Sequence, residues 1–128
     1  GIAALLSALD ESGWMLGVAT GKSDRGLTRC LDHHALRPLF VTLQTADRHP
    51  SKPHPSMVYQ ALAEAGADAA NAVVSGDTVY DIHMGRAAGT RTVGVNWGYH
   101  SVAALREAGA DYIAESMDEL KVYLENFA

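Results

Sequence analysis

The chain has 128 residues, of which 48% are hydrophobic and 20% are charged, and its formal net charge is −5 at pH 7. This length predicts one domain with a single core, and the composition is that of a globular protein, which excludes the disordered and fibrous classes. The 10 Lys and Arg residues are scattered and form no basic stripe, so nucleic acids and anionic membranes are not expected as partners.

Apolar residues recur along the chain in two alternating patterns, one typical of helices and one typical of buried strands. A polar segment with three prolines, 44–55, predicts a long loop. The alternation favours a Rossmann-like three-layer α/β/α fold with a mainly parallel sheet. The expected helices cover 2–12, 24–34 (capped by Ser23), 56–65, 79–88, 101–108 and the segment opened by the capping-box pattern Ser116–Glu119, and the expected strands cover 15–20, 39–43, 72–75, 91–95 and 112–114.

The only cysteine, Cys30, lies in an expected helix between Leu27 and Leu31. Because the chain has no second cysteine for a disulfide, we expect Cys30 to be a small buried apolar residue in a reducing compartment. No apolar run approaches the roughly 20 residues of a membrane span, and no basic-then-apolar signal segment opens the chain. The sequence therefore predicts a cytoplasmic protein without a membrane partner.

Two carboxylates, Asp77 and Asp81, follow the expected strand over 72–75, at the turn into the next helix. In open α/β sheets, ligands bind in the crevice beyond the carboxyl ends of the strands, and residues four apart on a helix can share that crevice. Two nearby carboxylates repel unless one is protonated or a cation lies between them. The pattern predicts a Mg²⁺ site, although an acid in the first helical turn is also explained by the helix dipole.

Three further strand ends carry polar residues that can face the same crevice. Thr20, Gly21 and Ser23 after the first strand offer a hydroxyl, an accessible amide and a helix N-terminus for an anion, or form a plain connection. Lys52, held between rigid residues of the proline-rich loop, either neutralises phosphate and carboxylate charge or is a solvated surface lysine. The aromatic loop Asn96-Trp97-Gly98-Tyr99-His100 either lines a substrate pocket or is a packed surface turn.

Together these motifs resemble the haloacid-dehalogenase (HAD) superfamily of phosphatases, and especially its phosphoglycolate-phosphatase-like branch, over essentially the whole chain. The motifs are Val18-Ala19-Thr20-Gly21-Lys22-Ser23, Lys52-Pro53, Gly76-Asp77-Thr78-Val79-Tyr80-Asp81 and Gly94-Val95-Asn96-Trp97-Gly98-Tyr99. The resemblance implies that Thr20 and Lys52 are catalytic and bind phosphate with Gly21, that Asp77 ligates Mg²⁺, and that Asp81 supports the ion directly or through water. It assigns Asn96 and Trp97 to a substrate loop.

The chain departs from the family in two respects. Family members begin with a strand ending in Asp-x-Asp-Gly-Thr, whose first aspartate is the nucleophile, followed by a helical cap, and neither feature has a match in this sequence. The resemblance therefore implies a single partial HAD-like core domain over 1–128, missing its central nucleophile strand. Three explanations stay open: an N-terminal part that exists but is absent from these residues, a strand supplied by another chain, or direct pairing of the two flanking strands. The sequence leaves the oligomeric state open.

We expect a parent enzyme that hydrolyses a small phosphorylated metabolite with Mg²⁺ through an aspartyl-phosphate, with phosphoglycolate as the leading candidate. Without the nucleophile, the 128 residues alone are expected to be inactive and to bind Mg²⁺ weakly or not at all. The same core also supports pyrophosphate hydrolysis and sugar-phosphate isomerisation. A further alternative is a non-catalytic phosphate- or metal-binding module, or an assembly subunit.

Overall fold

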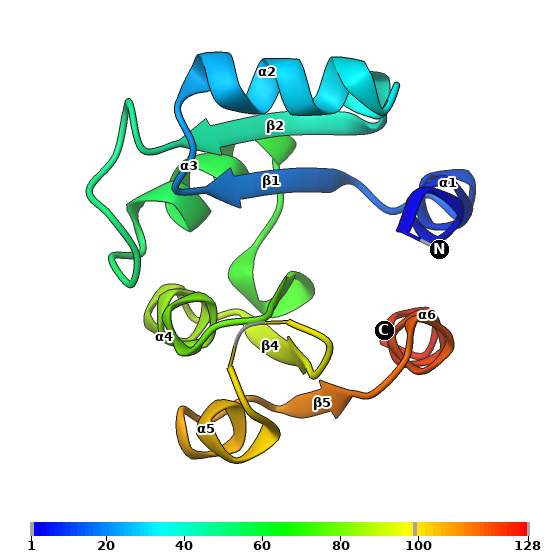
Figure 1. Ribbon diagram of the computed structural model, residues 1–128, viewed down its shortest axis with the longest axis vertical. Coiled ribbons are helices and arrows are strands. Elements are labelled where there is room, and N and C mark those ends of the chain that lie inside the picture. The colour runs from blue at the N-terminus through cyan, green and yellow to red at the C-terminus, as the bar shows by residue number, and fades with distance from the viewer. Residues whose placement is uncertain (1, 99, 128) are drawn as a thin grey trace. The chain divides into compact units, whose positions relative to one another are not determined.

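The computed structural model describes residues 2–98 and 100–127, and they form two compact units (Figure 1). Unit 1 contains the residues up to Ser51 together with Ser56–Gly66, and unit 2 contains Lys52–Pro55 together with the residues from Ala67 onward. None of the helices found in the described residues has the length and apolar character needed to cross a membrane.

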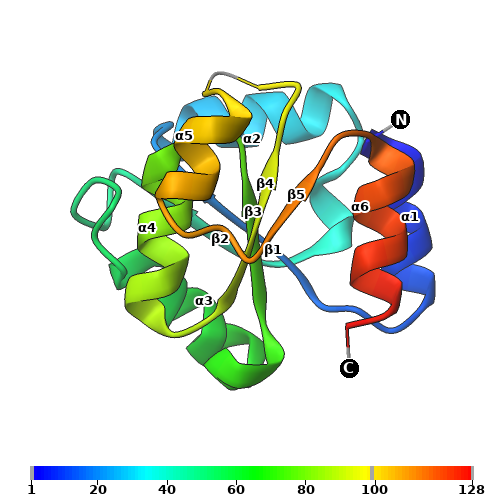
Figure 2. The same cartoon turned by 90° about the horizontal axis from the view of Figure 1, so that it is seen from below.

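Unit 1 is built on a pair of parallel strands. Strand β1 pairs with β2 from Leu16 opposite Phe40 to Thr20 opposite Thr45, with an irregularity after Leu16. Helix α3 packs on both strands, and α1 lies on the other side of the pair (Figure 2). The elements of unit 1 are α1 (Ile2–Glu11), β1 (Leu16–Thr20), α2 (Asp24–His33), the short 3-10 helix η1 (Arg37–Leu39), β2 (Phe40–Thr45) and α3 (Ser56–Ala65).

Local signals in the sequence explain where the helices of unit 1 begin and end. Gly13 follows α1 with a φ of 90°, a conformation that glycine adopts without a Cβ penalty. Ser23 caps α2, because its side-chain oxygen accepts a hydrogen bond from the Gly26 amide at 3.0 Å. Leu27 and Leu31, four residues apart, are the buried residues of α2, as expected for an amphipathic helix.

Unit 2 is built on a three-stranded parallel sheet with the order β3-β4-β5. Helices α4 and α5 pack on one face and α6 lies on the other face, where it contacts β5 (Figure 2). Ile82, Val93 and Leu105 are fully buried in the core between them. The elements of unit 2 are the 3-10 helix η2 (Ala69–Asn71), β3 (Val73–Gly76), α4 (Val79–Ala88), β4 (Arg91–Val95), α5 (Val102–Glu107), β5 (Tyr112–Ala114) and α6 (Met117–Glu125).

The expected α/β class with parallel strands is confirmed, with corrections at several positions. Strand β2 extends through Gln44 and Thr45, which are fully buried, so the loop predicted from residue 44 begins later. Cys30, expected to be buried, is exposed. Ser116 caps α6, but Glu119 accepts from the Glu115 amide at 2.6 Å, so the expected capping box is not completed.

One of the three explanations for the missing strand is not what the structure contains. Strand β1 pairs with β2 and strand β3 pairs with β4, and within the described residues the two pairs belong to separate sheets. Direct pairing of the strands that flank the missing one is therefore wrong. Among the strands of 2–98 and 100–127, one backbone edge of β1 and one edge of β3 have no strand neighbour.

Candidate active site

Lys52 and Asp81 form a largely buried ion pair. The Lys52 Nζ donates to Asp81 Oδ1 at 2.6 Å, and the two side chains are 23% and 9% exposed. The other carboxylate oxygen, Asp81 Oδ2, accepts from the Thr78 hydroxyl at 2.9 Å and from the Thr78 amide at 3.3 Å. Both oxygens of Asp81 are thus engaged within unit 2, one by a cation and one by the helix cap.

The start of α4 fixes Asp81 in this position. Thr78 is the N-cap, and its hydroxyl accepts from the Asp81 amide at 3.3 Å while Asp81 bonds back to the Thr78 amide. This reciprocal capping box satisfies donors that would otherwise lack partners at the first turn. Gly76, at the end of β3, is required because a Cβ on it would overlap the Asp81 side chain.

Asp77 lies between β3 and α4, is partly exposed, and is enclosed by the loop that follows β4. A Cβ on Gly98 would overlap the Asp77 side chain. The His100 amide donates to the Asp77 carbonyl at 3.1 Å, and His100 Nδ1 accepts from the Val79 amide at 2.8 Å. The loop and the Asp77 turn are therefore held against each other within unit 2.

The predicted substrate-loop residues lie on the same loop. The Asn96 amide donates to the Ala114 carbonyl of β5 at 3.1 Å, which anchors the start of the loop. Asn96 is exposed and Trp97 is 45% exposed, so both side chains are accessible to a ligand. Tyr99, which the family motif also includes, lies outside the described residues.

Unit 1 holds Thr20 and Gly21 at the carboxyl end of β1. The Thr20 hydroxyl oxygen accepts from the Lys22 amide at 3.2 Å, which leaves its O–H available as a donor. A Cβ on Gly21 would meet no atom within 4 Å, so the space above this backbone is open. The Ala46 amide donates to the Lys22 carbonyl at 3.2 Å, which ties this turn to the end of β2.

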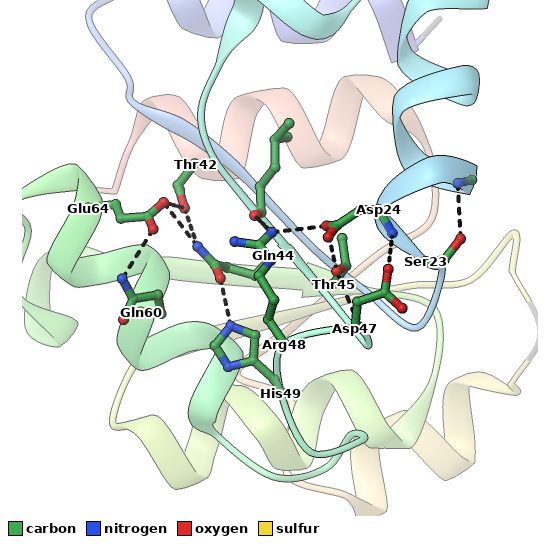
Figure 3. A network of polar contacts seen from close by, with 12 residues as sticks. Ser23, Asp24, Thr42, Gln44, Thr45, Asp47, Arg48, His49, Gln60 and Glu64 are labelled. Atoms are coloured by element: carbon green, nitrogen blue, oxygen red, sulfur yellow. Dashed lines mark hydrogen bonds and ion pairs between the residues drawn. The ribbon is translucent and has the colours of Figure 1, made fainter.

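A polar network that the sequence did not indicate connects β2, the following loop, α2 and α3 in unit 1 (Figure 3). On one side of it, Thr45 and Arg48 both donate to Asp24, at 2.8 and 3.2 Å, and the Asp24 amide donates to Asp47 at 2.7 Å. The network therefore fixes the beginning of the loop in which Lys52 follows.

The other side of the network surrounds Gln44, whose amide nitrogen donates to Thr42 at 2.8 Å and to Glu64 at 3.0 Å (Figure 3). His49 contacts the Gln44 amide oxygen at 2.7 Å. The hydrogen bond from the Thr42 hydroxyl, at 2.7 Å, followed by those from Gln60 and Gln44, holds the pKa of Glu64 below its ordinary value of 4.5. Sequence reasoning missed this group because polar residues in a strand give no periodic signal that distinguishes a buried network from a surface.

The site residues of unit 2 include carboxylate oxygens, which are suitable ligands for a hard cation such as Mg²⁺. Asp77 and Asp81 are near the same strand end, but both Asp81 oxygens already have partners in the protein. Within 2–98 and 100–127, no group of three His, Cys, Asp or Glu side chains is arranged to hold a metal ion. Asp77 and Asp81 therefore offer the kind of oxygen ligand that Mg²⁺ takes, and within the described residues they are not joined by a third such side chain.

The predicted site residues fall into two sets. Lys52, Asp77 and Asp81 lie together in unit 2 with the Asn96–Trp97 loop, whereas Thr20 and Gly21 lie in unit 1. Three features of unit 2 were not assigned a role from the sequence: the Thr78 cap on Asp81, the close approach of Gly98 to Asp77, and the His100 contacts. The capping signal for Thr78 was present in the spacing Thr-x-x-Asp, whereas the other two depend on contacts across about 20 residues of sequence.

A scan against protein families matches residues 1–95 to the family described as haloacid dehalogenase-like hydrolase. The chain belongs to this family. The resemblance inferred from the sequence motifs is thereby confirmed, and the strand ends that carry Thr20 and Asp77 both lie within the matched residues.

Relatives of this HAD-family chain include named phosphatases. It is 36% identical over 116 residues to pyrophosphatase PpaX of Bacillus pumilus, covering 90% of this chain and 54% of the relative. It is 30% identical over 116 residues to a phosphoglycolate phosphatase of Haemophilus influenzae, covering 90% of this chain and 52% of that one. The chain thus spans about half the length of the curated relatives it matches.

Solved structures support the same fold. A structure described as a predicted phosphatase from Clostridium acetobutylicum matches with a TM-score of 0.90 and 31% identity, over 98% of this chain and 58% of that one. The HAD-family chain therefore shares its parallel α/β architecture with that structure.

Proposed function

We propose that this HAD-family chain is part of a Mg²⁺-dependent phosphatase that hydrolyses a small phosphorylated metabolite through an aspartyl-phosphate. The observation that carries the proposal is the 2.6 Å contact between Lys52 and Asp81, beside Asp77 at the end of β3. A lysine held by a carboxylate at this place supplies fixed positive charge, which phosphoryl transfer needs more than it needs covalent chemistry.

Each predicted residue has a role in this proposal. Thr20 and Gly21 bind the phosphate oxygens through a hydroxyl and an amide, and the open space above Gly21 supports a close approach of the ligand. Lys52 stabilises the phosphoryl charge. Asp77 holds Mg²⁺, which neutralises phosphate charge when bound, while Asp81 supports that ion through water and orients Lys52.

We infer that the two units are halves of one core domain, 1–128, whose central strand and nucleophile come from a segment or chain outside these 128 residues. The open edges of β1 and β3 support this inference, because an open strand edge is costly unless it is covered. The chain alone is then inactive and binds Mg²⁺ weakly or not at all, and its cap also lies outside residues 1–128. We also place the protein in the cytoplasm, where an unpaired cysteine stays reduced.

Two substrates are candidates. Phosphoglycolate is favoured by the resemblance of the sequence Trp97-Gly98-Tyr99 to the phosphoglycolate-phosphatase-like branch, and the exposed side chains of Asn96 and Trp97 are consistent with contact to a ligand. Pyrophosphate is favoured by the higher identity to the Bacillus pumilus pyrophosphatase, 36% against 30% for the phosphoglycolate phosphatase. A non-catalytic phosphate-binding module is the alternative outside the enzyme class.

A chimera tests the proposal. A segment carrying the family's Asp-x-Asp strand and a cap, taken from a relative, is fused ahead of this chain and assayed on p-nitrophenyl phosphate, phosphoglycolate and pyrophosphate. We expect Mg²⁺-dependent hydrolysis that is lost in Lys52→Ala and when the nucleophile aspartate is changed to Asn. A folded chimera without activity overturns the phosphatase proposal and favours the binding module. Hydrolysis by the unfused chain overturns the proposal that its nucleophile lies elsewhere.

A further inference from the structure

His100 connects two segments of unit 2 that are 21 residues apart in sequence. Its backbone amide donates to the Asp77 carbonyl at 3.1 Å, and its ring nitrogen Nδ1 accepts from the Val79 amide at 2.8 Å. The ring also lies 5.8 Å from the ring of Tyr80 in a tilted arrangement. His100 thus bonds both to Asp77 itself and to Val79, where the turn passes into α4.

The chemistry of the second bond defines the state of the ring. Val79 is the first residue of α4, so its amide is one of the helix donors that have no partner inside the helix. An amide N–H pointed at Nδ1 requires a lone pair there, so the proton of the neutral imidazole is on Nε2. His100 therefore acts as a second cap of α4, in addition to the Thr78 hydroxyl.

The loop before His100 is held at both ends. Asn96 bonds to Ala114 of β5 at its start, His100 bonds to the Asp77 turn at its end, and Gly98 packs directly against the Asp77 side chain. Trp97, between these points, is 45% exposed. A movement of the loop that carries Trp97 must therefore strain or break the contacts to the Asp77 turn.

We propose that His100 is a positioning residue that locks the Trp97 loop to the Asp77 turn, so that ligand contacts at Trp97 and metal contacts at Asp77 are coupled. The inference rests on the proposed function for the roles of Trp97 and Asp77, but the lock itself does not. Because coupling between two sites is reciprocal, a ligand that orders the loop also orders Asp77. The lock thus gives the loop a part in arranging the metal site as well as in contacting substrate.

The test compares His100→Ala, His100→Asn and His83→Ala in the 128-residue chain by NMR. Asn carries an acceptor oxygen near the place of Nδ1 and is expected to preserve the bond to Val79, whereas Ala is not. His83 is an exposed histidine of α4, the helix that begins at Val79, and serves as the matched control. The readouts are amide exchange at Val79 and at residue 100, the order of the Trp97 indole, and the ¹⁵N shift of the wild-type His100 Nδ1.

We expect His100→Ala to speed exchange at the Val79 amide by about fivefold to tenfold, the equivalent of one lost hydrogen bond, and to lower the order of the Trp97 indole. His100→Asn restores most of both, and His83→Ala changes neither. The wild-type Nδ1 shows the shift of an unprotonated acceptor. Faster exchange at Val79 with an unchanged Trp97 indole overturns the coupling, as does equal behaviour of His100→Ala and His83→Ala.

A Mg²⁺ titration of the wild type and His100→Ala, each completed with the missing strand, separates this inference from the proposed function. If Mg²⁺ shifts the Asp77 amide in both chains but the Trp97 indole only in the wild type, the coupling is supported through the metal site. If Mg²⁺ at millimolar concentration shifts the Trp97 indole equally in both chains, the coupling is overturned. If Asp77 does not respond in a chain completed with the missing strand, its role as a metal ligand fails, while the exchange and indole results still decide the lock.

Discussion

Replacing Lys52 by Met removes the charge from the 2.6 Å pair with Asp81 and keeps most of the side-chain volume. Asp81, which is 6% exposed as a residue, then keeps only the two hydrogen bonds from Thr78 to its carboxylate. A buried carboxylate that loses its cation retains its desolvation cost without the compensating attraction. We therefore expect Lys52→Met to destabilise unit 2.

The magnitude follows from the geometry. Two unit charges at 2.6 Å attract by about 6 kcal/mol at an effective dielectric constant of roughly 20. Desolvation and side-chain ordering offset most of this attraction, and the Lys52 side chain stays 23% exposed, so the full cost of breaking a buried pair does not apply. Because Thr78 continues to bond to Asp81, the expected loss is about 2 kcal/mol, typical of one hydrogen bond to a charged group.

The assay is urea unfolding at pH 7 in a Trp14→Phe background, in which Trp97 is the remaining tryptophan and reports on unit 2. The matched control is Lys121→Met, which changes an exposed lysine of the same unit. It should alter the free energy of unfolding by less than about 0.5 kcal/mol. In an Asp81→Asn background, Lys52→Met should cost much less than it does alone. Equal effects of Lys52→Met and Lys121→Met, or additive effects of the two changes at the pair, would refute the reasoning.

Three further predictions concern other parts of the chain. The pKa of Glu64 is lower in the folded state than its ordinary 4.5, so its contribution to stability is present above pH 4.5 and is lost as pH falls through the lowered pKa. Glu64→Gln should therefore flatten the fall of the urea midpoint below pH 4.5. An unchanged dependence of the urea midpoint on pH contradicts this prediction. Gly98→Ala should destabilise unit 2 by about 1–2 kcal/mol and displace Asp77, whereas Gly21→Ala should leave the urea midpoint near that of the wild type, since its Cβ meets nothing within 4 Å. Cys30 is exposed, so it should react with Ellman's reagent in the folded chain at nearly the rate measured in urea, and strong protection of the thiol would show that it is buried.

The elements of the fold could be predicted from local signals. Helix α4 has the bounds that its apolar spacing indicates, because the capping pattern marks its start and Gly89 its end. Strand β4 has the bounds of its buried apolar run. The end of β2 could not be found in the same way. Gln44 and Thr45 are polar, and only their hydrogen bonds in the tertiary structure make burial in a strand possible. The prediction that Cys30 is buried was wrong for a related reason, since which face of α2 is covered depends on packing.

The sequence by itself determined the chemistry of the site: the residue types at the ends of the strands, their order, and the family to which they belong. It placed Asp77 and Asp81 four residues apart, and the family resemblance gave Asp77 the direct contact with Mg²⁺ and Asp81 a supporting role. Only the tertiary structure supplied their partners, because Asp81 is turned into the helix cap and bound by Lys52 while Gly98 and the loop of His100 pack against Asp77. Spacing along a helix decides which side chains can meet, but residues distant in sequence decide which partners each of them has.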